Sequence, residues 1–391
     1  MSINVLTLNN ISSKGLDKFP TPDYNVSNDQ ANPDLIVLRS YKMHDMDIPA
    51  NLKAVGRAGA GVNNIPIDKM SEQGIAVFNT PGANANAVKE LVIAGILLAC
   101  RNICQAWDYT RQLEGENAEL NKAVEAGKKQ YAGFELPGRT LGVIGLGAIG
   151  VLVANAARAM GMNVIGYDPG LTVSSAWQLS ADVEKAESID DLLSRSDFVT
   201  FHVPLIDATR NLLNAERIAM MPDNATILNF ARGGIVDDKA VLDALNHQKL
   251  HAYVCDFPTN EIKSHPQVIA LPHLGASTAE AEENCAMMVV DQLRDYLENG
   301  NIRNSVNLPS VSLPRTDAKR ISIVNRNMPD MLAQISHALG GHKVNIRNLV
   351  NDSKGNLAYT LIDVDALEDQ VAKDVISELC SVEGVLAVRV L

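Results

Sequence analysis

Three polar side chains in the second half of the chain follow apolar, β-rich runs and could act together in proton transfer. Arg232 follows the run ATILNFA, Glu261 lies beyond the run HAYVC, and His273 ends the run VIALP. Ligands of open parallel α/β sheets bind beyond the carboxyl ends of the strands, so these side chains can converge at one edge. A histidine there could remove a hydroxyl proton, because its ordinary pKa lies near neutrality.

An arginine, a histidine and a carboxylate in this setting suit the oxidation of a 2-hydroxy acid. Arg232 can hold a carboxylate through two parallel hydrogen bonds. His273 can take the hydroxyl proton while a hydride leaves the neighbouring carbon. Glu261 can hold the second imidazole nitrogen, orient the ring and raise the histidine pKa. Each residue alone has an ordinary alternative: a helix-flanking ion pair, a core histidine or a solvated loop acid.

A hydride needs an acceptor, and a glycine motif upstream predicts where that acceptor binds. Gly145, Gly147 and Gly150 have G-x-G-x-x-G spacing between the apolar run LGVI and the helix-compatible run VLVANAARAM. Gly145 would make a tight turn, Gly147 would let the backbone approach a pyrophosphate, and Gly150 would let the helix pack on the strand. The phosphates would then meet the unpaired amides at the helix N-terminus.

Asp168 predicts which dinucleotide binds. It ends the next run, NVIGYD, and lies 18 residues past Gly150. A carboxylate there can accept hydrogen bonds from the adenosine ribose and repels a 2′-phosphate, which favours NAD over NADP. The alternative is a nucleotide-free or methyl-donor-binding α/β fold, which the strand, the helix and Asp168 together disfavour.

The runs that carry these residues belong to two alternating regions. The first contains INVLTL, DLIVLRS, LKAVGRAG and GIAVFNTPG; the second contains LGVIG, NVIGYD, FVTFHVP, ATILNFA, HAYVCDF and VIALPH. Short apolar runs separated by helix-compatible stretches predict an α/β protein with two doubly wound, Rossmann-like parallel sheets. We expect one long helix from Ala87 to about Leu113 and another from about Ala279 to Glu298.

A third region follows the proline-containing stretch 306–317, which is typical of a linker. Its runs ISIVNR, MLAQISHALG, VNIRNLV, NLAYTLIDV, EDQVAKDVISELC and VLAVRVL have the ferredoxin-like order βαββαβ. We therefore expect a discontinuous substrate-binding domain at residues 1–92 and 280–308, a NAD-binding domain at 93–279, and a ferredoxin-like domain at 318–391.

Composition excludes several classes of partner. The 391 residues include 34 basic and 46 acidic side chains, and a formal charge of −12 gives no support to nucleic-acid or membrane binding. The longest apolar run, LVIAGILLAC, is too short to span a bilayer. Five scattered cysteines favour a reduced, cytoplasmic setting. His247 and His251 have metal-ligand spacing but no third ligand, so we expect no metal.

The combined motifs resemble the D-2-hydroxyacid dehydrogenase family. The segments ARGGIVD, CDFPTNE, PHLGAST, GLGAIG and YDP carry the resemblance, and NTPGANANAVKE and GRAGAGVNNI are similar to the family's substrate-domain loops. The C-terminal unit resembles an ACT domain. The resemblance implies a homodimer or homotetramer that oxidises 3-phospho-D-glycerate to 3-phosphohydroxypyruvate with NAD, the first step of serine biosynthesis.

The resemblance also assigns roles to individual residues. Arg232, Glu261 and His273 would be catalytic. Cofactor contacts would fall on Gly145, Gly147, Ala148, Ile149, Gly150, Asp168, Phe230, Ala231, Asp256 and Gly275, with Asp256 at the nicotinamide carboxamide. Substrate contacts would fall on Arg57, which would reach the phosphate, and on Arg39, Asn79 and Gly82, with Lys42 as a weaker candidate.

Two positions depart from the family pattern. Ile262 stands where many relatives have proline, and Asp330 stands where glycine is usual. Asp330 could N-cap the following helix, or it could repel an amino-acid effector that Asn325, Asn327 and Asn345 would otherwise bind. We expect weak or absent inhibition by serine.

Two other functions remain compatible with these motifs. One is a glyoxylate or hydroxypyruvate reductase, which would need no phosphate-binding Arg57. The other is a non-catalytic NAD-sensing scaffold, which could keep the whole dehydrogenase body.

Overall fold

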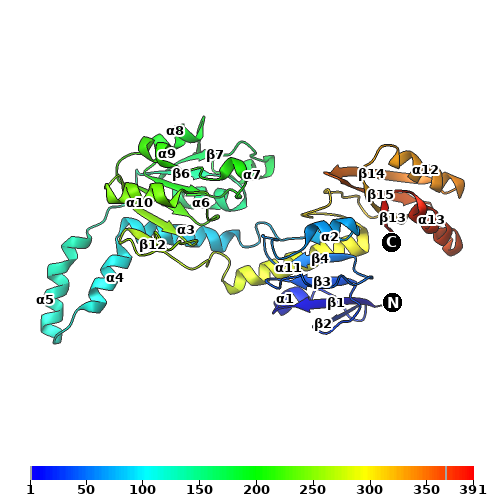
Figure 1. Cartoon of the computed structure of the whole chain (residues 1–391), viewed down its shortest axis with the longest axis horizontal. Helices are drawn as coiled ribbons and strands as arrows, with labels where there is room; N and C mark the ends of the chain where they lie inside the picture. The colour runs from blue at the N-terminus through cyan, green and yellow to red at the C-terminus, as the bar shows by residue number, and fades with distance from the viewer. Residues whose placement is uncertain (1, 366–367) are drawn as a thin grey trace. The chain divides into compact units, whose positions relative to one another are not determined.

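The computed structural model describes residues 2–365 and 368–391 and divides into two compact units (Figure 1). Unit 1 comprises Met1–Ala83 and Glu282–Leu391, and unit 2 comprises Asn84–Ala281. Each unit has its own sheets and is described by itself. Within the described ranges, no helix is long and apolar enough to cross a membrane.

The N-terminal part of unit 1 is a five-stranded parallel sheet. Its strands are β1 (Ile3–Leu8), β2 (Tyr24–Ser27), β3 (Leu35–Leu38), β4 (Ala54–Arg57) and β5 (Ala76–Phe78), in the order β2-β1-β3-β4-β5. Every residue of β3 is buried, as expected for a parallel strand covered on both faces. The helices are α1 (Ser13–Leu16), α2 (Ile67–Glu72) and the later α11 (Ala279–Asn299). The sequence predicted all of these strands except β2.

Unit 2 contains a seven-stranded parallel sheet. Its strands are β6 (Thr140–Ile144), β7 (Asn163–Tyr167), β8 (Glu184–Lys185), β9 (Phe198–Phe201), β10 (Ala225–Asn229), β11 (Leu250–Cys255) and β12 (Val268–Ala270). In the order β12-β11-β10-β9-β6-β7-β8, successive strands are added on one side of β6 as far as β8 and then on its other side from β9 onward. The strand order therefore reverses between β6 and β9, although all the strands are parallel. Such a reversal is the place where α/β sheets bind ligands. The predicted doubly wound fold is confirmed, although the short β8 was not predicted.

Helices connect the strands of this sheet. They are α6 (Ala148–Ala159), α7 (Val173–Gln178), α8 (Ile189–Ser194), the 3-10 turn η2 (Asp207–Thr209), α9 (Ala215–Met220) and α10 (Asp238–Asn246). Sequence-typical caps begin several of them: the Asp237 side chain, for example, accepts hydrogen bonds from the amides of Lys239 and Ala240 at the start of α10.

The prediction of a single helix from Ala87 to Leu113 was wrong. The segment forms α3 (Ala85–Cys100) and α4 (Ile103–Gln112), separated at Asn102, whose φ of 50° is left-handed. Asparagine tolerates this conformation better than most residues, and it ends the first helix. The polar stretch that follows is also helical, as α5 (Asn117–Gly127) and the 3-10 turn η1 (Lys128–Tyr131).

The C-terminal part of unit 1 has the predicted βαββαβ order. Its elements are β13 (Lys319–Arg326), α12 (Met331–Gly341), β14 (Ile346–Lys354), β15 (Leu357–Val364), α13 (Asp369–Ser381) and β16 (Val385–Val390). The strands form an antiparallel sheet in the order β14-β15-β13-β16, with both helices packed on a common apolar core. This is the ferredoxin-like arrangement that the sequence indicated.

The stretch 306–317 does not behave as a free linker. Leu308 and Val311 are 1% and 3% exposed, and Val311 pairs with Ile302 in an isolated antiparallel bridge. The apolar side chains of this stretch are therefore buried within unit 1 instead of extending through solvent. The three-domain division stays a prediction.

Candidate active site

The glycine motif forms a tight strand-to-helix turn in unit 2. Gly145 follows β6 with a φ of +93°, and a Cβ there would lie 2.6 Å from the carbonyl oxygen of His202. A Cβ on Gly150 would lie 1.9 Å from the carbonyl oxygen of Gly145. A Cβ on Gly147 would meet nothing within 4 Å. Two glycines thus serve the packing of the turn, whereas the third faces open space at the start of α6.

Asp168 braces this turn from the end of β7. Its Oδ2 accepts a hydrogen bond from the amide of Leu146 at 2.8 Å, and its Oδ1 accepts one from the amide of Gly170 at 2.8 Å. A carboxylate has about four lone-pair sites, so acceptor capacity remains for ribose hydroxyls. Asp168 therefore holds the glycine turn and also presents the carboxylate that the sequence motif predicts for ribose binding.

Arg232 lies on a turn that follows β10. Asn229 ends that strand, is 1% exposed, and donates from its amide nitrogen to the carbonyl of Arg232 at 2.9 Å. Its side-chain oxygen accepts from the amide of Ala231 at 3.2 Å. The guanidinium of Arg232 is exposed and donates to the carbonyl of Ala231. The neighbouring Phe230 is buried against α3, where its ring lies 3.0 Å from the Cβ position of Gly95.

Asp256, directly after β11, is a buried carboxylate without a partner residue. It is 3% exposed, and neither oxygen accepts a hydrogen bond from another residue that the structure describes. Burial raises the pKa of Asp256 to about 6, against the opposing effects of its own backbone amide and the charge of Arg232. Its Oδ2 lies 3.9 Å from the Cβ position of Gly275. A buried, unpaired acceptor of this kind suits a ligand that brings its own donor.

His273 follows β12 and packs on an aromatic ring. The centroid of the Phe257 ring lies 4.6 Å from that of His273, at an interplanar angle of 50°. Desolvation lowers the pKa of His273 below its usual value, and the positive charge of Arg232 lowers it further. Both effects favour the neutral imidazole, which is the form able to accept a proton.

Glu261 differs from expectation. The sequence predicted that it would hold His273 and raise the histidine pKa, yet that pKa is lowered and Glu261 is not among its causes. Glu261 is fully exposed, and its own pKa is lowered by its backbone amide and by the hydroxyl of Thr259. Glu261 lies six residues past the end of β11, on the exposed side of the loop, whereas the next residue, Ile262, is buried in the core of unit 2. The structure thus brings together Arg232, Asp256 and His273, but not Glu261.

The predicted substrate residues gather at the carboxyl edge of the sheet in unit 1. Arg39 follows β3, Arg57 ends β4, and Asn79 follows β5, which are neighbouring strands. The Nε atom of Arg57 donates to the carbonyl of Arg39 at 2.8 Å, and Arg39 forms an ion pair with Glu282 at 2.5 Å. Gly82 has a left-handed φ of +81°, which favours glycine.

Known proteins share this combination of fold and motifs. Residues 93–275 match the model of the D-isomer specific 2-hydroxyacid dehydrogenase, NAD binding domain. The chain is 40% identical over 287 residues to the D-3-phosphoglycerate dehydrogenase of Methanocaldococcus jannaschii, covering 71% of this chain and 52%, or about half, of that relative. It is 34% identical over 352 residues to the D-3-phosphoglycerate dehydrogenase of Haemophilus influenzae, covering 87% of this chain and 81% of that relative. The chain belongs to the D-isomer-specific 2-hydroxyacid dehydrogenase family.

A solved structure agrees at the level of the fold. The NAD+-bound 3-phosphoglycerate dehydrogenase of Entamoeba histolytica superposes with a TM-score of 0.60 and 24% sequence identity, covering 78% of this chain and 99% of that one. As a member of this family, the chain is a NAD-dependent dehydrogenase, as the sequence predicted. Its own residues fit the cofactor: Gly147 leaves room for a pyrophosphate, Asp168 retains acceptor capacity, and Asp256 lacks the donor that a carboxamide carries.

Several residues of this dehydrogenase site were missed by the sequence reasoning. Asn229 and Phe257 position Arg232 and the His273 ring, respectively. His202, directly after β9, is partly buried with a pKa lowered to about 3 by desolvation, and its Nε2 lies 3.1 Å from the hydroxyl of Thr200. Each of these residues ends or follows a strand at the carboxyl edge, so a polar or aromatic residue at that place was the available signal.

The asparagines that were predicted to bind an effector in the ACT-like domain do not all lie together in a single copy of the chain. Asn325 pairs with Ala358 at one end of the sheet, and its amide nitrogen donates to the carbonyl of Arg326. Asn345 lies at the other end, bonded to Asp365. About six residues of strand, or roughly 20 Å, separate the two ends. Asp330 occupies the N-cap position of α12 with a φ of +67°, but its side chain makes no cap hydrogen bond, so of the two alternatives for this residue the structure does not support a capping interaction.

Proposed function

We propose that this dehydrogenase oxidises 3-phospho-D-glycerate to 3-phosphohydroxypyruvate with NAD, as the first step of serine biosynthesis. Relatives at 34–40% identity carry the name D-3-phosphoglycerate dehydrogenase. The observation that supports the chemistry is the trio at the carboxyl edge of unit 2: a neutral His273, a cationic Arg232 and the unpaired Asp256.

In this proposal, His273 accepts the proton of the substrate 2-hydroxyl. Its lowered pKa provides the neutral imidazole that a general base requires. Arg232 holds the substrate carboxylate through paired N–H donors, which fixes the 2-carbon beside the histidine. NAD, when bound, supplies the acceptor for the hydride. Asp256 accepts a hydrogen bond from its carboxamide and thereby orients the nicotinamide ring. For Glu261 to stabilise the imidazolium, as the sequence predicts, its loop must turn the carboxylate toward His273 when substrate binds.

Arg57 provides the proposed selectivity for a phosphorylated substrate. A guanidinium is always charged and its planar fork matches two phosphate oxygens. The Nε donor of Arg57 is engaged with the carbonyl of Arg39, which orients the guanidinium. Arg39 contributes in the same way once a phosphate competes with Glu282 for it, and Asn79 and Gly82 line the adjacent loop.

One assay tests this function. We expect NADH production with 3-phosphoglycerate to exceed production with glycerate or lactate. Arg57→Ala should raise the KM for 3-phosphoglycerate and change the reaction with glycerate much less. His273→Ala should lower turnover by about 10²–10⁴-fold while NADH still binds. Equal use of all three acids would indicate a broader 2-hydroxyacid reductase, and NADH binding without turnover of any acid would indicate a sensing scaffold.

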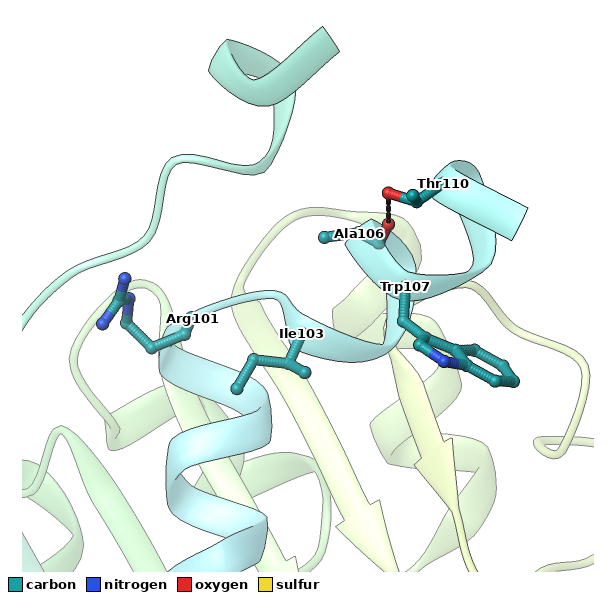
Figure 2. Close-up of a pocket in the computed structure, with 5 residues that line it drawn as sticks. All are labelled: Arg101, Ile103, Ala106, Trp107 and Thr110. Atoms are coloured by element: carbon teal, nitrogen blue, oxygen red, sulfur yellow. Dashed lines mark hydrogen bonds between the residues drawn. The ribbon is translucent and has the colours of Figure 1, made fainter. Parts of the chain in front are cut away.

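We also propose that the enzyme is a homo-oligomer, assembled in part through the hairpin of α4 and α5. Figure 1 shows these helices in cyan, extending away from the seven-stranded sheet. No residue of α4 is buried, and two of its large apolar side chains, Ile103 and Trp107, are 43% and 58% exposed. In Figure 2 both side chains point to the same side of α4, beside an open pocket of about 470 Å³. None of the proposed site residues lines this pocket.

Charge favours a second copy as the occupant of this surface. The chain carries a net charge of −12, so two copies repel each other over most of their surfaces. Residues 101–131 contain five basic and five acidic side chains, which gives no net charge. Trp107→Glu should therefore reduce the oligomer to smaller species in sedimentation. Trp177→Glu is the matched control, because Trp177 is 85% exposed on α7 and does not line the pocket.

Two further expectations belong to this proposal. The five cysteines are all free thiols, which supports a reducing, cytoplasmic setting. The ACT-like domain would serve mainly in assembly, with serine as at most a weak effector, because Asp330 places a carboxylate at the start of α12.

A further inference from the structure

We propose that two asparagines of unit 1, Asn64 and Asn9, are positioning residues for substrate binding. Their side chains hold the loop 39–41, which follows β3 and carries Arg39, and thereby fix Arg39 beside Arg57. The inference rests on the proposed function, in which these two arginines bind the substrate phosphate. Both asparagines act through the backbone of the loop and not by contact with the substrate.

Asn64 donates both protons of its side-chain amide to this loop. Its Nδ2 lies 2.7 Å from the carbonyl oxygen of Tyr41 and 3.2 Å from that of Arg39. The side chain is 7% exposed, and its Oδ1 has no partner among the residues that the structure describes. The Arg39 carbonyl also accepts from Nε of Arg57 at 2.8 Å, and a carbonyl oxygen has two lone pairs for these two donors. One carbonyl therefore joins both arginines to Asn64.

Asn9 holds the same loop from the neighbouring strand. It directly follows β1, which pairs with β3, and its Oδ1 accepts from the amides of Ser40 at 3.0 Å and Tyr41 at 2.6 Å. Its φ of 73° is left-handed, which asparagine tolerates better than most residues. The two asparagines thus bond backbone donors and acceptors of a segment that lies outside the helices and strands of unit 1.

The backbone around Asn64 is itself fixed by the core of unit 1. The Asn64 carbonyl accepts from the Met43 amide at 2.9 Å, and the Ile65 amide donates to the Val62 carbonyl at 3.1 Å in a tight turn. Met43 and Ile65 are 1% and 2% exposed and belong to the same apolar cluster. Asn64 therefore has a position that is set by buried neighbours, and it can impose that position on the loop after β3.

An ordered loop matters more for binding than for turnover. Fixing the backbone of one residue lowers an equilibrium constant by roughly tenfold through lost conformational entropy. If the asparagines order the loop before the substrate arrives, that loss is not added to binding. In the proposed function, proton transfer occurs at residues of unit 2. We therefore expect loss of either asparagine to raise the KM for a phosphorylated substrate and to leave kcat nearly unchanged.

Steady-state kinetics of the full-length enzyme test the role of Asn64. Asn64→Ala removes both donors and should raise the KM for 3-phosphoglycerate by about tenfold, with kcat within about twofold of the wild-type value. The inhibition constant of glycerate, which has no phosphate, should change by less than about twofold. An unchanged KM for 3-phosphoglycerate, or an equal weakening of both acids, would overturn the proposal.

Asn307→Ala is the matched control. Asn307 is also a buried amide of unit 1, at 9% exposed. Its Nδ2 donates to the Ile75 carbonyl at 2.9 Å, and its Oδ1 accepts from the Val77 amide at 2.9 Å, so its bonds lie just before and within β5. Asn307→Ala should destabilise unit 1 and leave the KM for 3-phosphoglycerate unchanged. A rise as large as that of Asn64→Ala would mean a general loss of structure and would contradict a positioning role.

Asn9→Gly provides a second variant in case Asn64→Ala does not fold. Asn9 is exposed, and glycine adopts its left-handed φ without strain, so this variant loses only the side-chain acceptor. It should raise the KM for 3-phosphoglycerate by about three- to tenfold. The double variant should raise the KM by less than the product of the two single effects, because both asparagines order one loop. Single effects that multiply would show that the asparagines act separately and would overturn the shared role.

Hydrogen exchange separates this inference from the proposed function. Without substrate, the amides of Ser40 and Tyr41 should exchange at least about tenfold faster in Asn64→Ala and Asn9→Gly than in the wild type. In Asn307→Ala they should exchange at the wild-type rate. If the wild-type enzyme turns over no 2-hydroxy acid, the proposed function fails, yet this measurement still decides whether the asparagines hold the loop. Equal exchange rates in all four proteins would overturn the inference.

Discussion

Two buried aspartates, Asp256 directly after β11 and Asp363 within β15, differ in whether their carboxylates have hydrogen-bond partners. Asp256 in unit 2 is 3% exposed, and neither of its oxygens has a partner among the other described residues. Asp363 on β15 is 1% exposed and receives both Nε and an Nη of Arg320, at 2.6 and 2.9 Å. Arg320 lies directly opposite on β13 and is itself 0% exposed.

The difference indicates what each carboxylate is for. Arg320 also donates to the carbonyls of Asn299, Leu313 and Pro314, so every donor direction of the pair is used and the ACT-like sheet is tied to the chain that precedes it. A buried charge that is fully satisfied in this way maintains structure. A buried carboxylate left without a partner destabilises the empty protein and gains its partner from a ligand.

The largest expected effect comes from breaking the satisfied pair. Arg320→Met should lower the free energy of unfolding by about 3–5 kcal/mol, because Asp363 is left as an uncompensated buried charge. Denaturant unfolding measures the loss. The double variant Arg320→Met with Asp363→Leu should recover most of it, since an apolar pair of similar volume avoids the desolvation of two charges. A double variant as unstable as the single one would show that the carbonyl contacts of Arg320 matter more than the ion pair.

The unpaired aspartate should respond in the opposite direction. Asp256→Asn is expected to stabilise the ligand-free enzyme by about 1 kcal/mol and to weaken NAD binding by about tenfold, because charge-assisted hydrogen bonds are roughly twice as strong as neutral ones. Thermal unfolding and NAD titration check the two effects. A destabilised Asp256→Asn enzyme would contradict the view that this carboxylate is unsatisfied.

The same residue predicts a pH dependence. Its pKa in the folded state is about 6, above the ordinary value of 3.8. The folded state therefore binds more protons between these values, and its stability falls as pH rises from about 4 to above 6, by up to about 3 kcal/mol. This decrease should be smaller in Asp256→Asn. Saturating NAD should oppose it in the wild-type enzyme by stabilising the charged form.

Asp168 lies between the two extremes, since backbone amides occupy part of its capacity and the rest is open to a ligand. Asp168→Ala should weaken NAD by about five- to tenfold, the scale of one or two hydrogen bonds, and should weaken NADP less because the repulsion of a 2′-phosphate disappears. Titration with both dinucleotides measures the preference. Loss of the Leu146 brace lowers both affinities together, so the ratio is the informative quantity, and an unchanged ratio would place the ribose elsewhere.

The smallest effect is expected at an exposed aspartate. Asp330→Gly should change stability by less than about 1 kcal/mol, in the stabilising direction, because glycine adopts the left-handed φ of +67° without strain. Initial rates with rising serine should show little inhibition in the wild type. Inhibition that arises only in Asp330→Gly would support the repulsion argument, whereas strong inhibition of the wild type at micromolar serine would contradict it.

Much of the fold could be predicted because local patterns and tertiary structure agree. The apolar runs of the two parallel sheets and the βαββαβ order of the last region all became strands and helices at the expected places. The failures were β2 and β8, which are short and polar, and the helix break at Asn102. A single left-handed residue in an otherwise helical pattern leaves the apolar periodicity on both sides intact, so periodicity alone could not locate it.

The sites follow the same division. Residue type and spacing were enough to predict the glycine turn, to put Asp168 directly after β7, and to put Arg232 and His273 just after β10 and β12, because a dinucleotide-binding turn requires particular residues in a particular chain order. Burial, pairing and side-chain direction depend on what packs around each residue, which is set by segments distant in the chain. Tertiary structure alone therefore decided that Asp256 is left unpaired among the described residues while Asp363 is held by Arg320, and that burial and the charge of Arg232, with no contribution from Glu261, lower the pKa of His273.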